Sequence, residues 1–344
     1  MELEIAQSIL SNFGLKESIV SIKRVESGLI NSTFVLNSSN NSYILQAINT
    51  NIFPNYKKGL ENILTVGNWL KRKNYSYSFP LPIKGKYLKV ENEVWRLMPC
   101  IKNSISYNLV LSLGQVKSAA SCLGEFYHHL SDFNTESLSI TLPNFHNGNF
   151  VTKKIKDALL NGEQERLSLS RPLINEIEKE LPILKKWDEV CNSLPIRVVH
   201  YDTKINNFLF DKKTDEVLAL IDLDTLMPGC VLSDIGDMIR TYSNPLGEES
   251  TEFKKVFCKM EIVNTIIKEF TNKAALEKEE TENLFFGGMA ITFMQCVRFL
   301  TDYLNGDSYY KTSYKDQNLV RAKNQWALYK SLRNNVKPPG ESLL

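Results

Sequence analysis

The spacing of apolar residues changes near residue 100. Before this point, β-branched and aromatic residues gather in short stretches typical of strands, separated by turn-prone Ser, Asn and Glu residues. The predicted strands are 19–26, 32–37, 42–48 and the two halves of 87–100. Helical spacing is confined to 3–13 and 56–73. The first hundred residues therefore predict an antiparallel sheet with two helices.

Helical spacing dominates the rest of the chain. Apolar residues recur at intervals of three and four along 113–130, which predicts an amphipathic helix. Further helices are predicted at 175–191, 252–273, 281–304 and 318–333. The segment 196–225 is the exception, because it alternates like short strands. We therefore predict an α+β protein of two lobes, a sheet lobe at 1–100 and a larger, mainly helical lobe at 101–344, with a cleft between them.

Composition excludes several classes of protein. The 344 residues are 43% hydrophobic and 23% charged, as in an ordinary globular chain. With 41 basic and 39 acidic residues, the net charge of +2 provides no broad field for gripping nucleic acid or an anionic membrane. We expect no nucleic-acid, membrane or obligate protein partner. Any bound anion must be held by local groups.

The chain shows no targeting signal. Its first ten residues are acidic where a signal peptide is basic, and the most apolar stretch, 285–300, is interrupted by Gln295 and Arg298. The six cysteines include no CxxC pair, which argues against a disulfide framework and a structural zinc site. A cytoplasmic protein with reduced thiols is expected.

The segment 196–225 combines polar residues with apolar surroundings. His200, Asp202 and Asn207 follow the spacing H-x-D-x-x-x-x-N, and Asp222 comes twenty residues after Asp202. Oxygen ligands of this kind suit magnesium, and the pattern matches the catalytic loop and metal-binding aspartate of kinases. The alternative is a purely structural pair in which His200 and Asp202 are hydrogen-bonded in a turn.

Five stretches carry a resemblance to a known superfamily. They are His200–Phe210, Ala219–Gly229, Arg298–Tyr310, Trp95–Pro99 and Tyr43–Gln46. On these residues the chain resembles the aminoglycoside phosphotransferase and choline kinase superfamily, and within it the N-acetylhexosamine 1-kinases. The resemblance runs over nearly the whole chain and implies a protein-kinase-like fold that uses ATP and Mg2+.

The resemblance implies roles for the residues of this loop. Asp202 would be the catalytic carboxylate that orients the attacking hydroxyl and accepts its proton, while Asn207 and Asp222 would hold magnesium. Lys204 would reach the γ-phosphate, although a solvent-facing lysine is an equal alternative. Asp224 is two residues after Asp222 and so shares a face of the predicted strand with it, where it either supports the metal or caps a turn.

A second aspartate motif follows at 233–237 with the sequence Ser-Asp-Ile-Gly-Asp. In the superfamily it opens a helix and braces the catalytic loop. A carboxylate at a helix start satisfies free amide groups, so we expect structural roles for Asp234 and Asp237.

The nucleotide site departs from the usual kinase pattern. Gly28 and Asn31 lie in a loop between the first two strands, where kinases cover the phosphates, although a plain hairpin turn would look the same. Gln46 stands where most kinases have a lysine that pairs the phosphates with a helix glutamate, and Glu61 stands at the glutamate position.

Positive charge for the phosphates must then come from elsewhere. Lys57, Lys58 and magnesium itself are the candidates. The backbone from Met98 to Cys100, which joins the lobes, would contact adenine.

Arg298 and Tyr309 match positions that contact the sugar in the hexosamine kinases, whereas Leu29 stands where those relatives tend to have histidine. His128, His129 and His146 lack metal-ligand companions and are expected to be surface or core residues. The resemblance therefore implies a kinase for a sugar hydroxyl, with the anomeric (C1) hydroxyl of an N-acetylhexosamine as the leading acceptor.

Three alternatives stay open at this stage. An aminoglycoside, choline or other amino alcohol could be the acceptor, and the acidic run 277–282 could serve a cation, although such runs are usually solvated helix faces. A pseudokinase that only binds nucleotide is favoured by Gln46 and the sparse glycine loop and opposed by the intact Asp202. A metal-dependent hydrolase would need more than one histidine near the metal.

Overall fold

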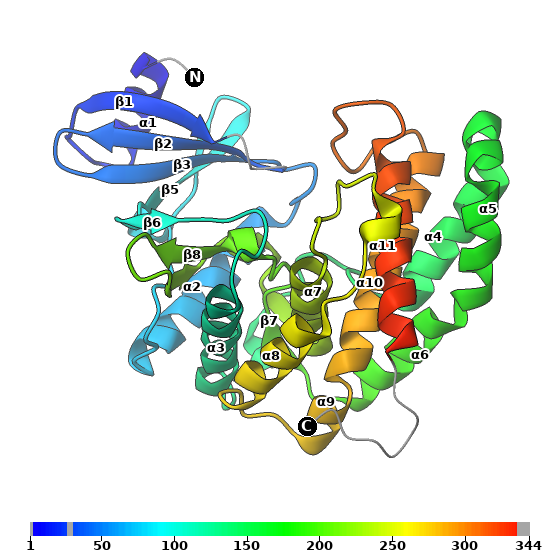
Figure 1. Cartoon of the computed structure of the whole chain (residues 1–344). Coiled ribbons are helices and arrows are strands. Elements are labelled where there is room, and N and C mark those ends of the chain that lie inside the picture. The colour runs from blue at the N-terminus through cyan, green and yellow to red at the C-terminus, as the bar shows by residue number, and fades with distance from the viewer. Residues whose placement is uncertain (1–2, 26–29, 336–344) are drawn as a thin grey trace.

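The computed structural model describes residues 3–25 and 30–335, which form a sheet lobe and a larger helical lobe (Figure 1). The sheet has five strands in the order β1-β2-β3-β5-β4, and each neighbouring pair is antiparallel. Its strands are β1 (Ile19–Val25), β2 (Ser32–Ser38), β3 (Ser42–Ile48), β4 (Leu88–Val90) and β5 (Glu93–Pro99). The predicted α+β class and these strands are confirmed.

Strand alternation gives the sheet two different faces. On one face, Phe34, Leu45 and Leu97 pack against Ile9 and Leu10 of α1 (Leu3–Asn12) to form the small core of this lobe. The residues between them point to the opposite face, because successive strand side chains alternate. Polar residues on that opposite face can therefore meet the helical lobe, as Arg96 does through Asp224.

The second helix, α2 (Tyr56–Arg72), belongs to the core of the helical lobe. Ile63, Val66 and Leu70 lie in that larger core, and the buried Asn62 donates to the backbone oxygen of Leu226 at 2.9 Å. Figure 1 shows α2 below the sheet and next to α3. The chain leaves the sheet after Pro99 and enters the helical lobe at β6 (Ser104–Ile105).

The helices of the second lobe agree with the predicted ones only in part. They are α3 (Leu113–His129), α4 (Gly148–Asn161), α5 (Gln164–Glu180), α6 (Pro182–Ser193), α7 (Leu232–Ser243), α8 (Met260–Thr271), α9 (Lys278–Glu282), α10 (Leu284–Leu304) and α11 (Gln317–Asn334). The single helix predicted at 175–191 is wrong, because Pro182 starts a new helix at a position where its missing N–H costs nothing. The helix predicted from 252 starts only at Met260, and α4 was not predicted at all.

Helix α10 is the central element of the helical lobe. It packs against α11, α7 and α4, and Gly236 of α7 approaches it so closely that an added Cβ would lie 2.6 Å from the backbone oxygen of Gly287. Among the residues that the structure describes, α10 alone is long and apolar enough to cross a membrane, yet 78% of its most apolar window is buried inside the protein. It is therefore the core helix of this lobe.

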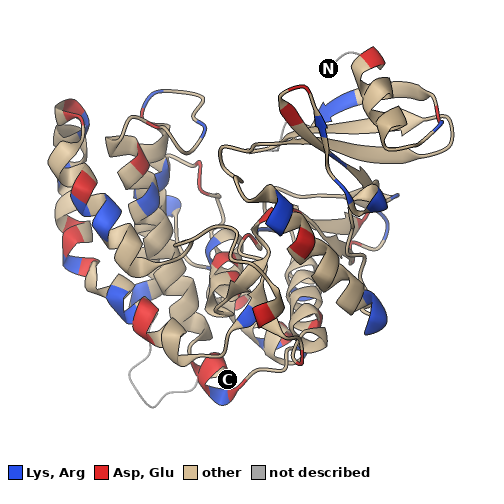
Figure 2. Cartoon of the chain, turned by 180° about the vertical axis from the view of Figure 1, so that it is seen from behind, with Lys and Arg blue, Asp and Glu red and all other residues tan. Residues whose placement is uncertain are grey.

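Short strands between the lobes carry the candidate chemistry. They are β7 (Arg197–Val199), β8 (Phe208–Asp211), β9 (Val217–Leu220) and β10 (Met227–Gly229), in two small sheets, β10-β7 and β6-β8-β9. Basic and acidic residues are interspersed over both lobes (Figure 2), in agreement with the near-zero net charge, and all six cysteines are free.

Candidate active site

The loop after β7 is fixed from two sides. The buried His200 ring joins it to the end of β9, because Nε2 hydrogen-bonds the backbone oxygen of Ile221 at 2.9 Å and Nδ1 accepts from the Asp202 amide at 3.2 Å. Asp234, in the first turn of α7, accepts hydrogen bonds from the amides of His200 (2.9 Å) and Tyr201 (2.6 Å). Asp234 therefore braces the loop, as expected from the sequence.

This loop presents Asp202 as an ionised carboxylate. Its Oδ2 lies 2.8 Å from Lys204 Nζ and accepts a hydrogen bond of 2.8 Å from Asn207 Nδ2. Burial by itself raises the pKa of Asp202, but the Lys204 ammonium and the Asn207 amide bring it below the usual value. Asp202 can therefore accept a proton from a hydroxyl group at neutral pH, and Lys204 is held in the site as a partner of Asp202.

Asn207 and Asp222 are close neighbours. Asn207 ends the turn 205–207, and its backbone oxygen accepts at 2.9 Å from the amide of Ile221, the residue before Asp222. Asp222 adopts a left-handed backbone conformation (φ 62°), and within the described part of the chain its carboxylate has no hydrogen-bond or ion-pair partner. The loss of hydration in the folded protein, together with the negative charges of Asp224 and Asp202, raises the pKa of Asp222 to about 6.

These two residues fit a magnesium ion. The Asn207 amide donates through Nδ2, which leaves Oδ1 as an acceptor, and Asp222 offers two unpartnered oxygens in a cluster of carboxylates that a cation would relieve. The described residues contain no group of three His, Cys, Asp or Glu side chains placed to hold a metal. Magnesium in phosphotransfer sites usually takes only one or two carboxylates and completes its shell with phosphates and water.

A row of polar side chains crosses the cleft-facing side of the sheet. Thr33, Gln46 and Arg96 are aligned on β2, β3 and β5 by the strand register. Gln46 donates to Thr33 Oγ1 at 2.9 Å and accepts from Arg96 Nε at 2.8 Å. The cation absent from position 46 is therefore found one strand away, on Arg96, a residue that the sequence analysis missed. An arginine between Trp95 and Leu97 in a buried strand was the available signal.

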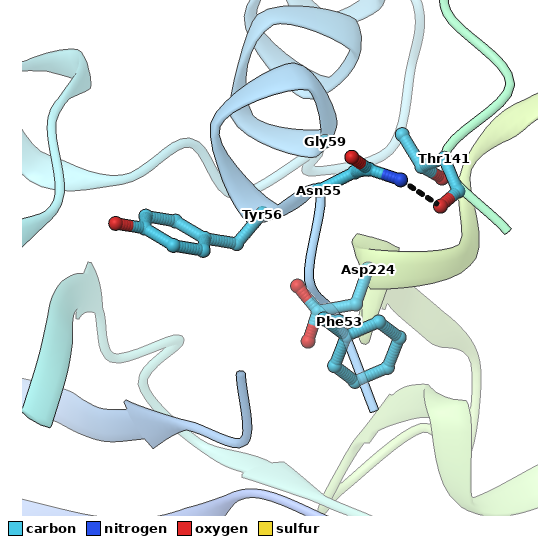
Figure 3. A pocket seen from close by; sticks show the side chains of 6 residues that line it. All are labelled: Phe53, Asn55, Tyr56, Gly59, Thr141 and Asp224. Carbon is cyan, nitrogen blue, oxygen red and sulfur yellow. Dashed lines mark hydrogen bonds between the residues drawn. The ribbon is translucent and has the colours of Figure 1, made fainter. Parts of the chain in front are cut away.

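Asp224 contacts this row from the other lobe. Both of its oxygens accept from the Arg96 guanidinium, and Oδ2 also accepts from Asn31 Nδ2 at 2.7 Å. Figure 3 shows Asp224 and Phe53 lining a small pocket at the start of α2. The prediction that Asp222 and Asp224 share one face of a strand is wrong, because β9 ends at Leu220 and 223–225 is a short 3-10 turn.

The other predicted nucleotide contacts have mixed outcomes. Gly28 lies outside the described residues. Glu61, expected at the position of the kinase glutamate, is exposed on α2 while the next residue, Asn62, is buried, and its part in nucleotide binding stays a prediction. Lys57 and Lys58 are also exposed.

The expected adenine contacts lie where the lobes join. Met98 is paired with Ile44 at the end of β5, and the Cys100 amide donates to the backbone oxygen of Ser42 at 3.3 Å. Their contact with adenine stays a prediction.

The two predicted sugar contacts, Arg298 and Tyr309, lie next to each other. The Arg298 guanidinium lies 4.9 Å from the ring centre of Phe145, 5.9 Å from that of Tyr309 and 5.7 Å from that of Tyr310. Its hydrogen bond goes to Gln295 Oε1 at 3.1 Å, and within the described residues no carboxylate lies within 4 Å of it. A half-buried cation is thus held on aromatic rings without a carboxylate in ion-pair contact.

His146 connects this cation to the catalytic loop. Its ring stacks on Phe145 (4.6 Å between centres) and packs edge-on against Tyr201 (5.4 Å), the residue before Asp202. Burial, with Arg298 and Arg240 nearby, lowers the pKa of His146 well below its usual value, so the ring is neutral. Its Nδ1 is buried without a partner among the described residues. From the sequence, His146 was expected only to be a surface or core residue.

Comparison with known families and structures agrees with this geometry. A family model described as "Phosphotransferase enzyme family" matches residues 21–254, which is more than half of the chain.

Three solved structures share the fold along almost their whole length. A spectinomycin phosphotransferase bound to ADP and spectinomycin has a TM-score of 0.63 at 12% identity and covers 96% of this chain and 97% of its own. An aminoglycoside 2'-phosphotransferase bound to GDP has a TM-score of 0.60 at 14% identity, with coverage of 97% and 99%. A choline kinase from Streptococcus pneumoniae has a TM-score of 0.56 at 14% identity, with coverage of 96% and 99%.

Proposed function

Because the chain belongs to the phosphotransferase enzyme family, we propose that it is an ATP- and Mg2+-dependent kinase for a neutral sugar. It is an enzyme that transfers a phosphoryl group to a hydroxyl acceptor. The leading acceptor is the anomeric hydroxyl of an N-acetylhexosamine, whose product would be the sugar 1-phosphate. The single observation that supports a neutral acceptor is the uncompensated charge of Arg298.

An amine-bearing acceptor would fit this region poorly. Aminoglycosides, choline and aminopropanol are cations, and a second cation beside Arg298 would be repelled. The aromatic rings that could bind an ammonium group lie 4.9 to 5.9 Å from the Arg298 guanidinium, so a second cation on them would lie close to a like charge. The carboxylate of Asp302 is occupied, since it accepts from the amides of Tyr309 and Tyr310, whereas Asp237 pairs with Arg240 through Oδ1 only and its buried Oδ2 has no partner among the described residues.

A neutral sugar would instead meet the groups that it needs. Hydroxyl and amide oxygens can accept from Arg298, and the apolar face of a sugar can pack on Tyr309, whose side chain is exposed.

The residues of the catalytic loop would act in one step. Asp202 accepts the proton of the attacking hydroxyl as that oxygen bonds to the γ-phosphorus and the bond to the leaving ADP oxygen breaks. Asn207 and Asp222 would hold magnesium, which neutralises charge on the β- and γ-phosphates. Lys204, fixed 2.8 Å from Asp202, would keep the carboxylate ionised and oriented.

The experiment is an acceptor screen read by ADP release. We expect turnover with N-acetylglucosamine or N-acetylgalactosamine, a phosphate at C1 by phosphorus NMR, and none with choline, aminopropanol or spectinomycin. Turnover of an amine while both sugars fail would refute the proposal. Arg298→Lys keeps the charge but loses the planar fork, and Arg298→Met removes the charge, so sugar KM should rise in that order while ATP affinity is unchanged.

A binding module without catalysis is the competing function. Asp202→Asn separates the two, because an enzyme should lose turnover by about 100-fold or more while still binding ATP. Indifference of the protein to this substitution would support the pseudokinase.

A further inference from the structure

A polar cluster beside the catalytic loop joins the two lobes. Its members are Arg96 on β5, Asp224 in the turn after Asp222, and Asn31 just before β2. The side chains of Arg96 and Asp224 are only 3% and 8% exposed, so this ion pair is enclosed between the sheet and the helical lobe. No role for this cluster follows from the spacing of the catalytic motif.

The cluster leaves Arg96 little freedom. Its two terminal nitrogens donate to the two oxygens of Asp224, with Nη2 2.9 Å from Oδ2. Nε donates to Gln46 Oε1 at 2.8 Å, and Nη1 also donates to the Tyr87 hydroxyl at 3.2 Å. A guanidinium fork engaged in this bidentate way fixes orientation as well as distance.

The cluster also reaches the loop that would cover the phosphates. Asn31 donates to Asp224 Oδ2 at 2.7 Å, and its Oδ1 accepts from the Asn49 amide at 2.9 Å. One carboxylate thus receives groups from the end of that loop and from β5. It lies two residues after Asp222, whose left-handed φ of 62° L-residues rarely adopt without support from their surroundings.

We propose that Arg96 and Asp224 are positioning residues that align the sheet lobe with the metal-binding turn, in place of the missing lysine–glutamate pair. Gln46 and the exposed Glu61 cannot form that pair. Arg96, one strand over, instead holds Asp224, and Asp224 holds the turn that presents Asp222 to magnesium. The inference rests on the proposed role of Asp222 as a magnesium ligand.

The test uses the full-length protein and the fluorescent nucleotide N-methylanthraniloyl-ATP, titrated with and without saturating Mg2+. Partners that orient metal ligands typically contribute 10- to 100-fold to affinity. The variants Arg96→Gln, Asp224→Asn and the double variant should each lose about tenfold or more of the Mg2+-dependent gain in nucleotide affinity. The affinity without Mg2+ should change much less.

The double variant separates positioning from simple stability. Breaking one partner leaves a buried charge, whereas removing both charges does not, so the urea midpoint should recover in the double variant. Recovery of stability without recovery of the Mg2+ effect is the expected result. Recovery of both would overturn the proposal, because the pair would then be a dispensable structural contact.

A matched control is available in the helical lobe. Arg197 and Glu280 form a second bidentate pair, at 3.0 and 2.6 Å, whose carboxylate is buried on α9 at the far end of the lobe from the sheet (Figure 1). Arg197→Gln/Glu280→Gln should leave the Mg2+ effect unchanged. An equal loss there would overturn the proposal, since any buried pair would then produce it.

Two further variants keep the outcome decisive. If the cleft variants do not fold, Asn31→Ala removes a single contact of Asp224 and should still lower Mg2+-dependent affinity by about fivefold, and no change would overturn the proposal. Asp222→Asn should abolish the Mg2+ effect altogether. If it does not, the magnesium assignment fails, which is a different result from failure of the Arg96–Asp224 pair.

Discussion

Asp234 provides a quantitative test of how the catalytic loop is held. It is fully buried and accepts from two backbone amides and from the Tyr127 hydroxyl at 2.9 Å. In Asp234→Ala these three donors lose their acceptor. At about 1–3 kcal/mol for each unpaired buried group, the loss is about 3–9 kcal/mol, a large part of a typical stability of about 5–15 kcal/mol.

The charge of Asp234 adds a dependence on pH. Burial raises its pKa from 3.8 to about 6 in the folded protein, against the effect of its hydrogen bonds. Between these values the folded state binds more protons than the unfolded state, so the stability that this group contributes falls as pH rises from about 4 to about 6. At about 1.4 kcal/mol per pKa unit, the change is up to about 3 kcal/mol.

Urea unfolding followed by tryptophan fluorescence measures both effects. Asp234→Asn has no titration here, so the difference in unfolding free energy between wild type and this variant should shrink by about 3 kcal/mol from pH 4 to pH 7. Tyr127→Phe removes one donor and should cost only about 1 kcal/mol. A difference that stays constant with pH would show that burial does not shape the charge of Asp234 and would refute this reasoning.

Three other outcomes are expected. Gly236→Ala should lower the urea midpoint and the free energy of unfolding by about 1–3 kcal/mol, because the new Cβ meets the backbone of Gly287. The control Gly59→Ala on α2 meets nothing within 4 Å and should raise the free energy of unfolding by up to about 1 kcal/mol. Equal effects of the two substitutions would contradict the packing argument. His146→Gln keeps a neutral hydrogen-bonding group, so the KM for the acceptor should stay within about threefold of the wild-type value. His146→Lys introduces a charge and should raise this KM further. The reverse order would show that the His146 ring is charged. EDTA should abolish ADP release and added Mg2+ should restore it; turnover that persists in EDTA would exclude Asn207 and Asp222 as essential metal ligands.

The strands and the catalytic loop could be predicted because each has a characteristic spacing of residues that are close together in the sequence. Alternation marks β2, β3 and β5, and the side chains of His200, Asp202 and Asn207 contact one another within the loop itself, although Asp234 and Ile221 also hold it. The pairing of Gln46 with Arg96 depends instead on which strand lies beside β3, and fifty residues separate the two side chains. Periodicity within one strand carries no information about that neighbour.

Two smaller differences concern the direction in which a side chain points from a helix or a turn. Glu61 and Asn62 are adjacent, and one step of about 100° around a helix moves a side chain from the solvent side to the buried side. Asp222 and Asp224 were placed on a common strand face, but a left-handed residue followed by a 3-10 turn destroys alternation. Arg298 and His146 meet only through tertiary packing around Phe145.

The central position of α10 has a consequence for how the protein is made. During translation, α7 leaves the ribosome before α10, and its packing face stays uncovered until residues 284–304 follow. Asp234, which holds the loop that presents Asp202, lies on α7. This loop is therefore held by a fully packed helix only after α10 has docked against α7. A nonsense mutation between α7 and residue 284 would therefore abolish phosphoryl transfer, although Asp202, Asp222 and Asp234 would already have been synthesised.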